Sequence, residues 1–324
     1  MMKKITRIIL FTLLLILPMM GSAQLIACRD SIKNTYDFWL YVPSDYNPAV
    51  CEKPVVIFLH GKSLSGTDLS QVLEYGSIDA LKRGRVIDAI VIAPQAQSAW
   101  NPKKIMDIYD WTKNHYTIDT NRLYVLGMSM GGYGTIDFTA TYPDKVAAAI
   151  ALCGGATKKE LCGLNEVPLW IIHGTADNAV PVRASERVVD SMCACGDTSL
   201  LIFDKLQKVN HSQLARVFYL DQTYDWLFEH SLSDSIRMVN RDYVMNDSVL
   251  KSATLGLHRT ELPTRDSKPR RHKAPADMQY YYVKKGDNLT TIAAKNHTTV
   301  NRLCQLNHIS KESILRIGQR LRLK

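Results

Sequence analysis

The sequence of 324 residues contains a single long hydrophobic run, close to its start, and this excludes a membrane protein with several spans. Its seven cysteines include no pair with the two-residue gap of the usual redox motif, and no histidine pair accompanies them, which argues against a zinc site. Hydrophobic residues make up 46% of the chain, too many for a disordered protein. Length and composition therefore predict a folded protein of roughly two domains.

The hydrophobic run is preceded by positive charges and followed by small residues. Three basic residues lie within Met1–Arg7, the apolar run covers Ile8–Met20, and Gly21–Ala23 follows. This pattern predicts a secretory signal peptide over residues 1–23, cleaved after Ala23, because the run is too short to span ~30 Å of hydrocarbon. A second interpretation reads Leu25–Cys28 as a lipoprotein box, with a lipid anchor at Cys28. Either interpretation exports the protein to the periplasm, the cell envelope or the medium.

An exported protein meets oxidising conditions, so disulfide bonds are expected. Cys153 with Cys162, or Cys28 with Cys51, would close short loops, and the odd number of cysteines leaves at least one without an internal partner. The sequence does not fix the pairing. The seven positions are Cys28, Cys51, Cys153, Cys162, Cys193, Cys195 and Cys304.

Charge divides the chain into three parts. The formal net charge is +9, but residues 24–230 carry −4, residues 231–279 carry +3 and residues 280–324 carry +7. A basic part beside an acidic body predicts a negatively charged partner outside the body. Residues 231–279 contain three prolines and the basic run 268–273, and their later half lacks periodicity, so they are interpreted as a linker. Export argues against nucleic acid as the partner of that run.

Short β-rich segments alternate with helical spacing across residues 24–230. Continuous apolar runs such as Val55–Leu59 are typical of strands buried on both faces of a mostly parallel sheet. In open α/β sheets, functional groups lie beyond the carboxyl ends of the strands, so each strand exit is a candidate position. The expected strands are 39–42, 54–59, 89–93, 123–126, 147–152, 169–172 and 200–203, and the expected helices include 103–116 and 132–142.

One strand exit carries a nucleophile motif. The segment Gly127–Gly131 reads G-x-S-x-G between an apolar strand and a helical run. The glycines allow a sharp turn that exposes the hydroxyl of Ser129, and the helix start adds partial positive charge where an oxyanion would form. The segment Gly61–Gly66 resembles this motif but has serine at its fifth position, so it is not a candidate.

Two later strand exits supply an acid and a base. Asp177 follows the strand 169–172, and His211 follows the strand 200–203. The order Ser129, Asp177, His211 is the one used by α/β-hydrolases. His211 would accept the proton of the serine during attack and return it to the leaving alcohol, while Asp177 would orient the imidazole. His173 is interpreted as packing beneath the aspartate loop.

An oxyanion hole needs two backbone N–H donors. Met130 follows the nucleophile, and Lys62 follows the early buried strand, so their N–H groups are the candidates. His60, Gly61 and Trp100 are expected to line the substrate pocket, although Trp100 is also compatible with the core.

These motifs resemble the α/β-hydrolase superfamily, and most of all its secreted phospholipase/carboxylesterase-like and feruloyl-esterase-like esterases. The resemblance rests on His60-Gly61, GMSMGG, HGTADNAVP and the late histidine, and it covers about residues 35–230. It implies a serine ester hydrolase with no metal or organic cofactor, acting on an ester of small to medium size through an open site. A serine peptidase of the same fold and a non-catalytic protein that binds cell-wall glycan remain the alternatives.

The last 45 residues predict a small β-α-α-β unit. YYVKKGDNLTTIAAK, LCQLN and IGQRLRL resemble the LysM domain along its whole length, over residues 280–324. The resemblance implies binding of peptidoglycan or another glycan that contains N-acetylglucosamine. It places the glycan groove at Gly286, Asp287, Asn288, Leu289, Asn307, Ile314 and Ile317. The chain as a whole is therefore predicted to be an α/β-hydrolase tethered to the cell wall.

Overall fold

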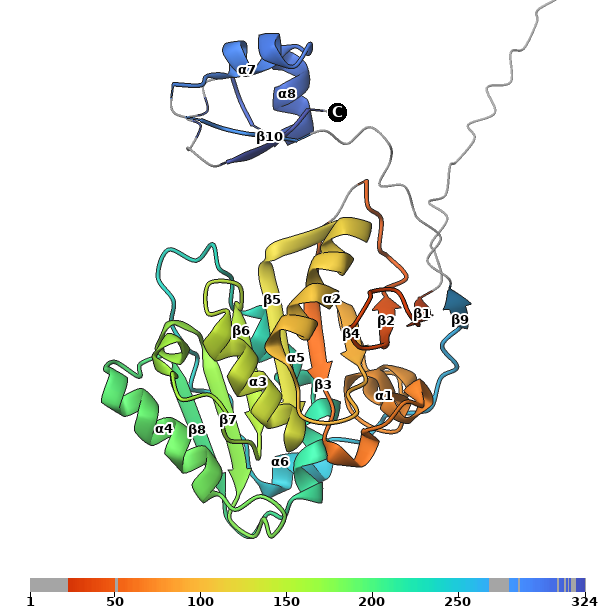
Figure 1. The fold of residues 1–324 in the computed structure, drawn as a ribbon, viewed down its shortest axis with the longest axis vertical. Helices are drawn as coiled ribbons and strands as arrows, with labels where there is room; N and C mark the ends of the chain where they lie inside the picture. The colour runs from red at the N-terminus through yellow and green to blue at the C-terminus, as the bar shows by residue number, and fades with distance from the viewer. Residues whose placement is uncertain are drawn as a thin grey trace, which may run out of the picture.

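A computed structural model describes residues 23–49, 52–267, 280–284, 286–307, 309–311, 313, 315 and 319–323 (Figure 1). The predicted signal peptide, up to residue 22, and the basic run 268–273 lie outside the described residues. No helix within the described ranges is long and apolar enough to cross a membrane.

The body of the protein is a sheet of nine strands in the order β8-β7-β6-β5-β3-β4-β2-β1-β9. The strands from β3 to β8 pair in parallel, whereas β2 pairs antiparallel with both β1 and β4. The predicted mostly parallel α/β sheet is confirmed. Its strands are β1 (Gln24–Cys28), β2 (Phe38–Val42), β3 (Lys53–Leu59), β4 (Ile90–Pro94), β5 (Ile118–Met128), β6 (Ala148–Leu152), β7 (Leu169–Gly174), β8 (Leu201–Leu206) and β9 (Thr264–Ser267).

Helices cover both faces of the sheet because successive side chains of a strand point to opposite sides. On β3, Val55 and Ile57 belong to one buried cluster and Val56 and Phe58 to the other. The first cluster contains side chains of α2 (Pro102–His115), α3 (Met130–Thr141) and α4 (Arg183–Cys195). The second contains side chains of α1 (Ser77–Lys82), the 3₁₀ helix Ser212–Tyr219, α5 (Asp221–Phe228) and α6 (Asp247–Ser252). Each central strand is therefore buried on both sides, as its apolar run predicts.

Residues 231–267 pack against the body, although the sequence predicts a linker from residue 231. Met245 and Leu250 are buried in the cluster that also holds α5, and β9 pairs in parallel with β1. The strand β9 has the sequence Thr-Arg-Asp-Ser, which carries no strand pattern, so its pairing depends on the exposed edge of β1. Residues 231–267 therefore belong to the body, and the rest of the predicted linker, residues 268–279, lies outside the described residues.

A disulfide joins Cys162, at the start of the 3₁₀ helix Cys162–Glu166, to Cys195 at the end of α4. This corrects the expected pairing of Cys162 with Cys153. Cys153 is fully buried at the end of β6, whereas packing of the 3₁₀ helix beside α4 brings Cys195 close. Cys28 is buried at the end of β1, and Cys51, its predicted partner, lies outside the described residues.

The C-terminal module has its own small core. Two short strands, β10 (Tyr280–Tyr282) and β11 (Arg320–Arg322), pair antiparallel, and α7 (Leu289–Lys295) and α8 (Val300–Asn307) lie between them in the chain. Asn288 caps α7 through a capping box with Thr291, and the hydroxyl of Thr299 accepts the N–H of Arg302 at the start of α8. The predicted β-α-α-β order is confirmed. Its buried residues are Val283, Leu289, Ile292, Ala293, Leu303, Leu321 and Leu323.

Candidate active site and glycan groove

Five strand exits meet at one edge of the sheet. Strand register aligns Leu59 with Gly127, Met128 with Leu152, and Leu152 with Ile172. The loops after β3, β5, β6 and β7 therefore begin at the same level, and the loop after β8 begins beside Gly174. This register brings segments together that lie more than 100 residues apart in the sequence.

Ser129 occupies a strained turn between β5 and α3. Its φ of 59° and ψ of −120° lie in a region that a residue with a side chain rarely adopts. Its backbone N–H donates to the carbonyl of Leu152 at 2.9 Å, and its carbonyl accepts the N–H of Tyr133, so both sides of the turn are held. The side chain stays half-buried at the N-terminus of α3. The geometry is that of a nucleophile elbow.

The glycines around Ser129 are required by close packing of backbone. A Cβ on Gly131 would lie 1.9 Å from the carbonyl oxygen of Leu59, and one on Gly127 would lie 2.4 Å from the carbonyl oxygen of Gly131. Such contacts do not occur between real atoms. The motif glycines therefore let α3 start directly against the end of β3.

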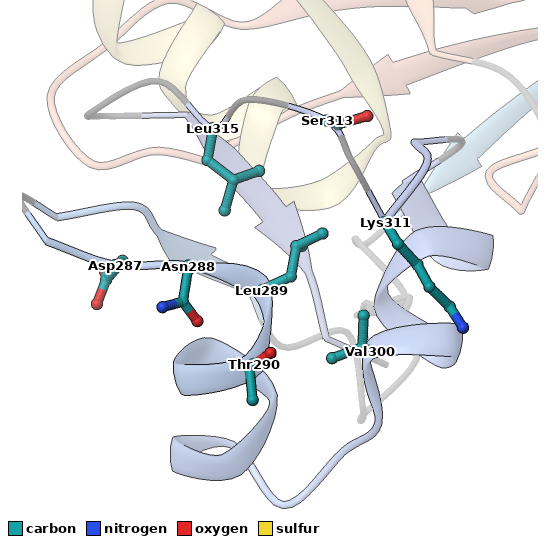
Figure 2. A pocket seen from close by; sticks show the side chains of 8 residues that line it. All are labelled: Asp287, Asn288, Leu289, Thr290, Val300, Lys311, Ser313 and Leu315. Carbon is teal, nitrogen blue, oxygen red and sulfur yellow. The ribbon is translucent and has the colours of Figure 1, made fainter.

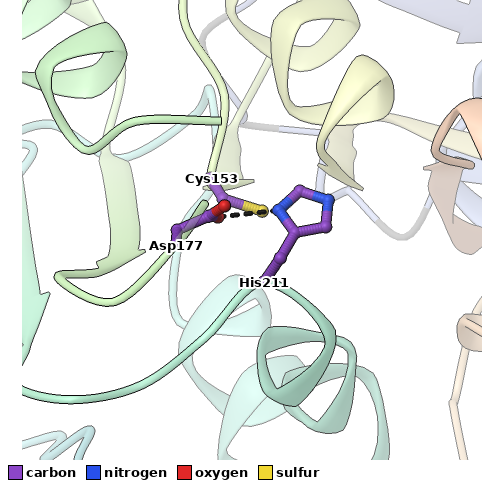
Figure 3. Close-up of side chains that lie close together, drawn as sticks. All are labelled: Cys153, Asp177 and His211. Atoms are coloured by element: carbon purple, nitrogen blue, oxygen red, sulfur yellow. Dashed lines mark hydrogen bonds and ion pairs between the residues drawn. The ribbon is translucent and has the colours of Figure 1, made fainter. Parts of the chain in front are cut away.

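Asp177 is a buried carboxylate that accepts three hydrogen bonds. Its Oδ1 accepts the backbone N–H groups of Ala179 and Val180 at 2.9 and 2.8 Å. Its Oδ2 lies 2.7 Å from Nδ1 of His211, from which it accepts a hydrogen bond (Figure 3). The His211 ring remains 26% exposed, whereas the aspartate side chain has no exposed surface. A hydrogen bond from Nδ1–H to Asp177 leaves Nε2 as the basic atom of the ring.

His173 supports the aspartate loop from below. It is fully buried, with ring nitrogens 2.7 Å from the Ser185 hydroxyl and 2.8 Å from the Val180 carbonyl. Burial lowers the pKa of His173 from its usual value, which favours the neutral ring. Its Nε2 lies 3.5 Å from Oδ2 of Asp177, too far for a strong hydrogen bond, so His211 is the partner of that carboxylate.

Both candidate oxyanion donors stand at helix starts. Met130 is the first residue of α3, and Lys62 is the first residue of the 3₁₀ helix Lys62–Leu64. N–H groups at the start of a helix have no partner within it, so they are available to an anion. Gly61 lies directly beside the nucleophile: a Cβ on it would lie 3.4 Å from the Cβ of Ser129. The loop after β3 therefore runs past the serine hydroxyl.

His60 and Trp100, predicted to line the substrate pocket, are buried behind the loop instead. The Nε2 of His60 accepts the N–H of Ala96 at 3.0 Å, and its Nδ1 lies 2.8 Å from the Gly61 carbonyl. Burial lowers its pKa to about 4. The indole N–H of Trp100 donates to the His60 carbonyl, and its ring packs edge-on against the imidazole. Of the three predicted pocket residues, only Gly61 stands beside Ser129, because the apolar side chains turn inward to the core.

Tyr75 contacts the loop after β3, but no sequence pattern marks it as a site residue. Its hydroxyl accepts the N–H of Gly61 at 2.7 Å, and its ring packs against Phe58 and Phe218. Burial raises the pKa of the Tyr75 phenol, which keeps it protonated. The residue lies in a loop between a 3₁₀ helix and α1, where no periodicity or motif marks it.

The C-terminal module has a groove of about 630 Å³. Figure 2 shows apolar side chains, among them Leu289 and Val300, beside polar ones at the start of α7. Gly286 has a φ of +87°, which its turn requires, and Asp287 is held by Tyr281, Lys284 and Lys295. The lining residues are Asp287, Asn288, Leu289, Thr290, Val300, Lys311, Ser313 and Leu315.

The predicted glycan residues fall into three groups. Asp287, Asn288 and Leu289 line the groove, and Gly286 precedes them in the turn. The Asn307 amide does not line it: it donates to the carbonyls of Leu303 and Arg322 and accepts the Arg322 N–H, so it ties α8 to β11. Ile314 and Ile317 lie outside the described residues.

The fold defines an α/β-hydrolase body followed by a small β-α-α-β module. Residues 96–220 match the phospholipase/carboxylesterase family model, and residues 281–324 match the model of the LysM domain. The chain therefore contains an α/β-hydrolase domain of the carboxylesterase type and a C-terminal LysM domain, as the sequence motifs indicate.

Several proteins similar to this chain are named as esterases. The bifunctional acetylxylan esterase/xylanase XynS20E of Neocallimastix patriciarum is 29% identical over 163 residues, which cover 46% of this chain and 22% of that protein. Acetylxylan esterase A of Emericella nidulans is 33% identical over 131 residues, 36% of this chain and 41% of the relative. This chain thus spans less than half of either relative. A solved thermostable esterase is 27% identical with a TM-score of 0.53, covering 64% of this chain and 63% of that one.

Proposed function

We propose that this protein is an exported serine ester hydrolase that removes small acyl groups, and that its LysM domain holds it at a glycan of the cell envelope. The observation that carries the proposal is the 2.7 Å contact between His211 and Asp177 at the sheet edge where Ser129 occupies a strained elbow. The arrangement supplies a nucleophile, a base and an orienting carboxylate in the order of an α/β-hydrolase.

The chemistry follows from these positions. His211 takes the proton of Ser129 through Nε2 while the hydroxyl oxygen attacks the ester carbonyl. The backbone N–H groups of Met130 and Lys62 stabilise the oxyanion, aided by the N-terminus of α3. The protonated imidazole is stabilised by Asp177 and passes its proton to the leaving alcohol. Water then cleaves the acyl-enzyme by the same steps, so each turnover releases one acid and one alcohol.

Acetyl groups on polysaccharide are the proposed substrate. The relatives named as acetylxylan esterases, which are 29% and 33% identical over the matched residues, support this class. The basic LysM part, with a net charge of +7, favours an anionic envelope as the place of action. Binding of a wall glycan there would keep the hydrolase near acetylated glycan at high effective concentration.

A chain-length series of p-nitrophenyl esters tests the hydrolase. Acetate is expected to turn over fastest, with a steep fall beyond short acyl chains, and Ser129→Ala should lose at least about 10⁴-fold in kcat because the nucleophile is gone. Asp204→Ala, at a half-buried aspartate on β8 that accepts the indole N–H of Trp170, is the control for loss of a polar side chain outside the site and should keep wild-type turnover. Equal background turnover by the wild type and Ser129→Ala would overturn the proposal. Release of acetate from acetylated xylan and from acetylated peptidoglycan then separates the two sources of substrate.

Co-sedimentation with purified peptidoglycan tests the LysM domain in the full chain. Thr290→Glu and Lys311→Glu place negative charge in the groove and should abolish sedimentation. Lys159→Glu, an exposed lysine of the hydrolase body, makes the same charge change elsewhere and should sediment like the wild type. Equal sedimentation of all variants would show that the groove does not bind the glycan.

A further inference from the structure

Cys153 is a buried thiol at the strand exit between the serine turn and the aspartate loop. It follows β6 directly, it forms no disulfide, and its side chain has no exposed surface. The carbonyl of the preceding residue, Leu152, accepts the N–H of Ser129, and the N–H of Cys153 donates to the carbonyl of Ile172. The residue is thus pinned to both neighbouring strands at the level of the candidate site.

The backbone of Cys153 is strained as well. Its φ of 38° lies in the left-handed region, which residues with a side chain seldom adopt. Strain of this kind persists where the surrounding structure overrides it and is concentrated at functional sites. A glycine would adopt this backbone conformation without strain, but it would also remove the thiol from this place.

The thiol stands next to the acid and the base. Its Sγ, a carboxylate oxygen of Asp177 and a ring nitrogen of His211 all lie within 4.8 Å of one another, and Figure 3 shows the sulfur beside the bond between the other two. Burial and the negative charge of Asp177 raise the pKa of the Cys153 thiol well above its usual value. The group therefore stays a neutral S–H donor, and it is neither a second nucleophile nor a second anion.

We propose that Cys153 is a positioning residue, whose S–H faces the Asp177 carboxylate and holds it in line with Nδ1 of His211. The backbone N–H groups of Ala179 and Val180 fix only Oδ1 of that carboxylate. The oxygen that binds His211 has no backbone donor of its own among the described contacts, so the thiol supplies the remaining contact on the inner side. This inference rests on the proposed function, because it assigns a support to the same triad.

Three substitutions test whether Cys153 acts as a hydrogen-bond donor or only fills space. Cys153→Ala removes the thiol, Cys153→Gly removes it while suiting the positive φ, and Cys153→Ser keeps a small donor in the same place. We expect the Ala and Gly variants to lower kcat about tenfold with little change in KM. A misdirected base stabilises the transition state less well but leaves substrate binding unchanged. Ser should recover most of the lost rate.

The pH dependence of kcat/KM and a proton resonance provide readouts that a purely structural role would leave unchanged. In the Ala and Gly variants, the acid limb should move to lower pH because the carboxylate stabilises the imidazolium less well. The downfield NMR signal of the proton shared by His211 and Asp177 should move upfield in both and return in Ser. This signal does not depend on ester turnover, so it tests the inference even if the wild type hydrolyses no ester.

Each outcome of these measurements either supports the positioning role of Cys153 or overturns it. Wild-type kcat, pH profile and proton signal in both Ala and Gly would overturn the proposal, and so would a Ser variant as impaired as Ala. A lower melting temperature with unchanged kcat and an unmoved proton signal would assign Cys153 to packing alone and also overturn it. If Ala does not fold, Gly, which fits the backbone, gives the measurement.

Discussion

The hydroxyl of Tyr75 accepts the backbone N–H of Gly61 at 2.7 Å, although the two residues belong to different loops. Gly61 lies beside Ser129 and precedes Lys62, whose N–H is the proposed second oxyanion donor. The tyrosine ring is held by Phe58 and Phe218, so the loop after β3 is anchored to the core through a phenol. The position of the proposed oxyanion donor therefore depends on a side chain that lies outside the predicted motifs.

Replacing Tyr75 with phenylalanine should impair catalysis more than folding. Tyr75→Phe keeps the ring contacts but leaves the N–H of Gly61 without its acceptor, at a cost of about 1–3 kcal/mol. We expect kcat/KM for p-nitrophenyl acetate to fall about tenfold through kcat, because the oxyanion donor is less well placed. Tyr109→Phe, at a buried tyrosine on α2, is the matched control and should keep wild-type kcat. A change in KM alone would contradict the expected role.

Two glycines of the site should respond differently to alanine. Gly61→Ala places a Cβ 2.8 Å from the Tyr75 hydroxyl, the movable end of a side chain, and 3.4 Å from the Cβ of Ser129. The variant should fold and lose activity because the new methyl group narrows the site. Gly131→Ala places a Cβ 1.9 Å from the carbonyl oxygen of Leu59, which is backbone, so this variant should fail to fold. Circular dichroism and activity of the soluble fraction check both, and a folded, active Gly131→Ala would contradict the close packing.

Buried histidines should make the hydrolase body less stable in mild acid. Burial holds the pKa of His60 at about 4 in the folded state, below the unperturbed value of 6.5 that applies on unfolding. The unfolded chain therefore binds more protons between these values, and stability falls as pH decreases from about 6.5 to about 4, by up to about 3 kcal/mol for this group. Burial also lowers the pKa of His173 and of His230, and both act in the same direction. Urea unfolding between pH 7.5 and 4.5 measures the slope, which should be shallower in His60→Gln; an identical slope would rule out His60 as a contributor.

The disulfide should stabilise the region around α4. Cys162 and Cys195 are 33 residues apart, and removing a crosslink that closes a loop of that size costs about 4 kcal/mol of stability. Cys195→Ser should therefore lower the urea midpoint and make it insensitive to reductant. Cys193→Ser, on the same helix at an exposed free cysteine, should behave like the wild type. A non-reduced peptide map should show the crosslink directly, and a map with Cys162 joined to any other cysteine would refute the pairing.

The mature N-terminus should be Gln24, without a lipid. Cys28 is buried at the end of β1, opposite Phe38 and beside Ser267 of β9. Lipoprotein processing before Cys28 would remove four of the five residues of β1, including the buried Leu25 and Ile26. Intact mass and N-terminal sequencing of the exported protein measure the cleavage site. An acylated N-terminal cysteine would contradict the placement of β1 in the mature sheet.

The strand exits could be predicted from the sequence because the central strands are continuous apolar runs. Such runs fix the parallel sheet, and the sheet then brings the exits that bear Ser129, Asp177 and His211 to one edge. Cys153 follows β6, whose exit lies at the same edge. The same argument therefore predicts that its thiol lies near Asp177 and His211.

Features that depend on tertiary contacts left no local signal. Strand β9 is polar and forms because β1 offers an unpaired edge, while β1 itself resembles a processing site. The partner of Cys162 depends on how a 3₁₀ helix packs beside α4. His60 and Trp100 face inward, where they contact each other and His60 accepts the N–H of Ala96. Tyr75 contacts Gly61 across two loops, and no local sequence pattern around Tyr75 predicts this contact.

The pairing of β9 with β1 has a mechanical consequence. Strand β9 is the last described element before the LysM domain, and it lies at the border of the sheet opposite β8. A pull on the LysM domain would therefore reach the body through β9, where the parallel β9–β1 pair spreads the force over several backbone hydrogen bonds. Three strands, β2, β4 and β3, separate that pair from β5, so the elbow of Ser129 lies far from the edge that carries the load.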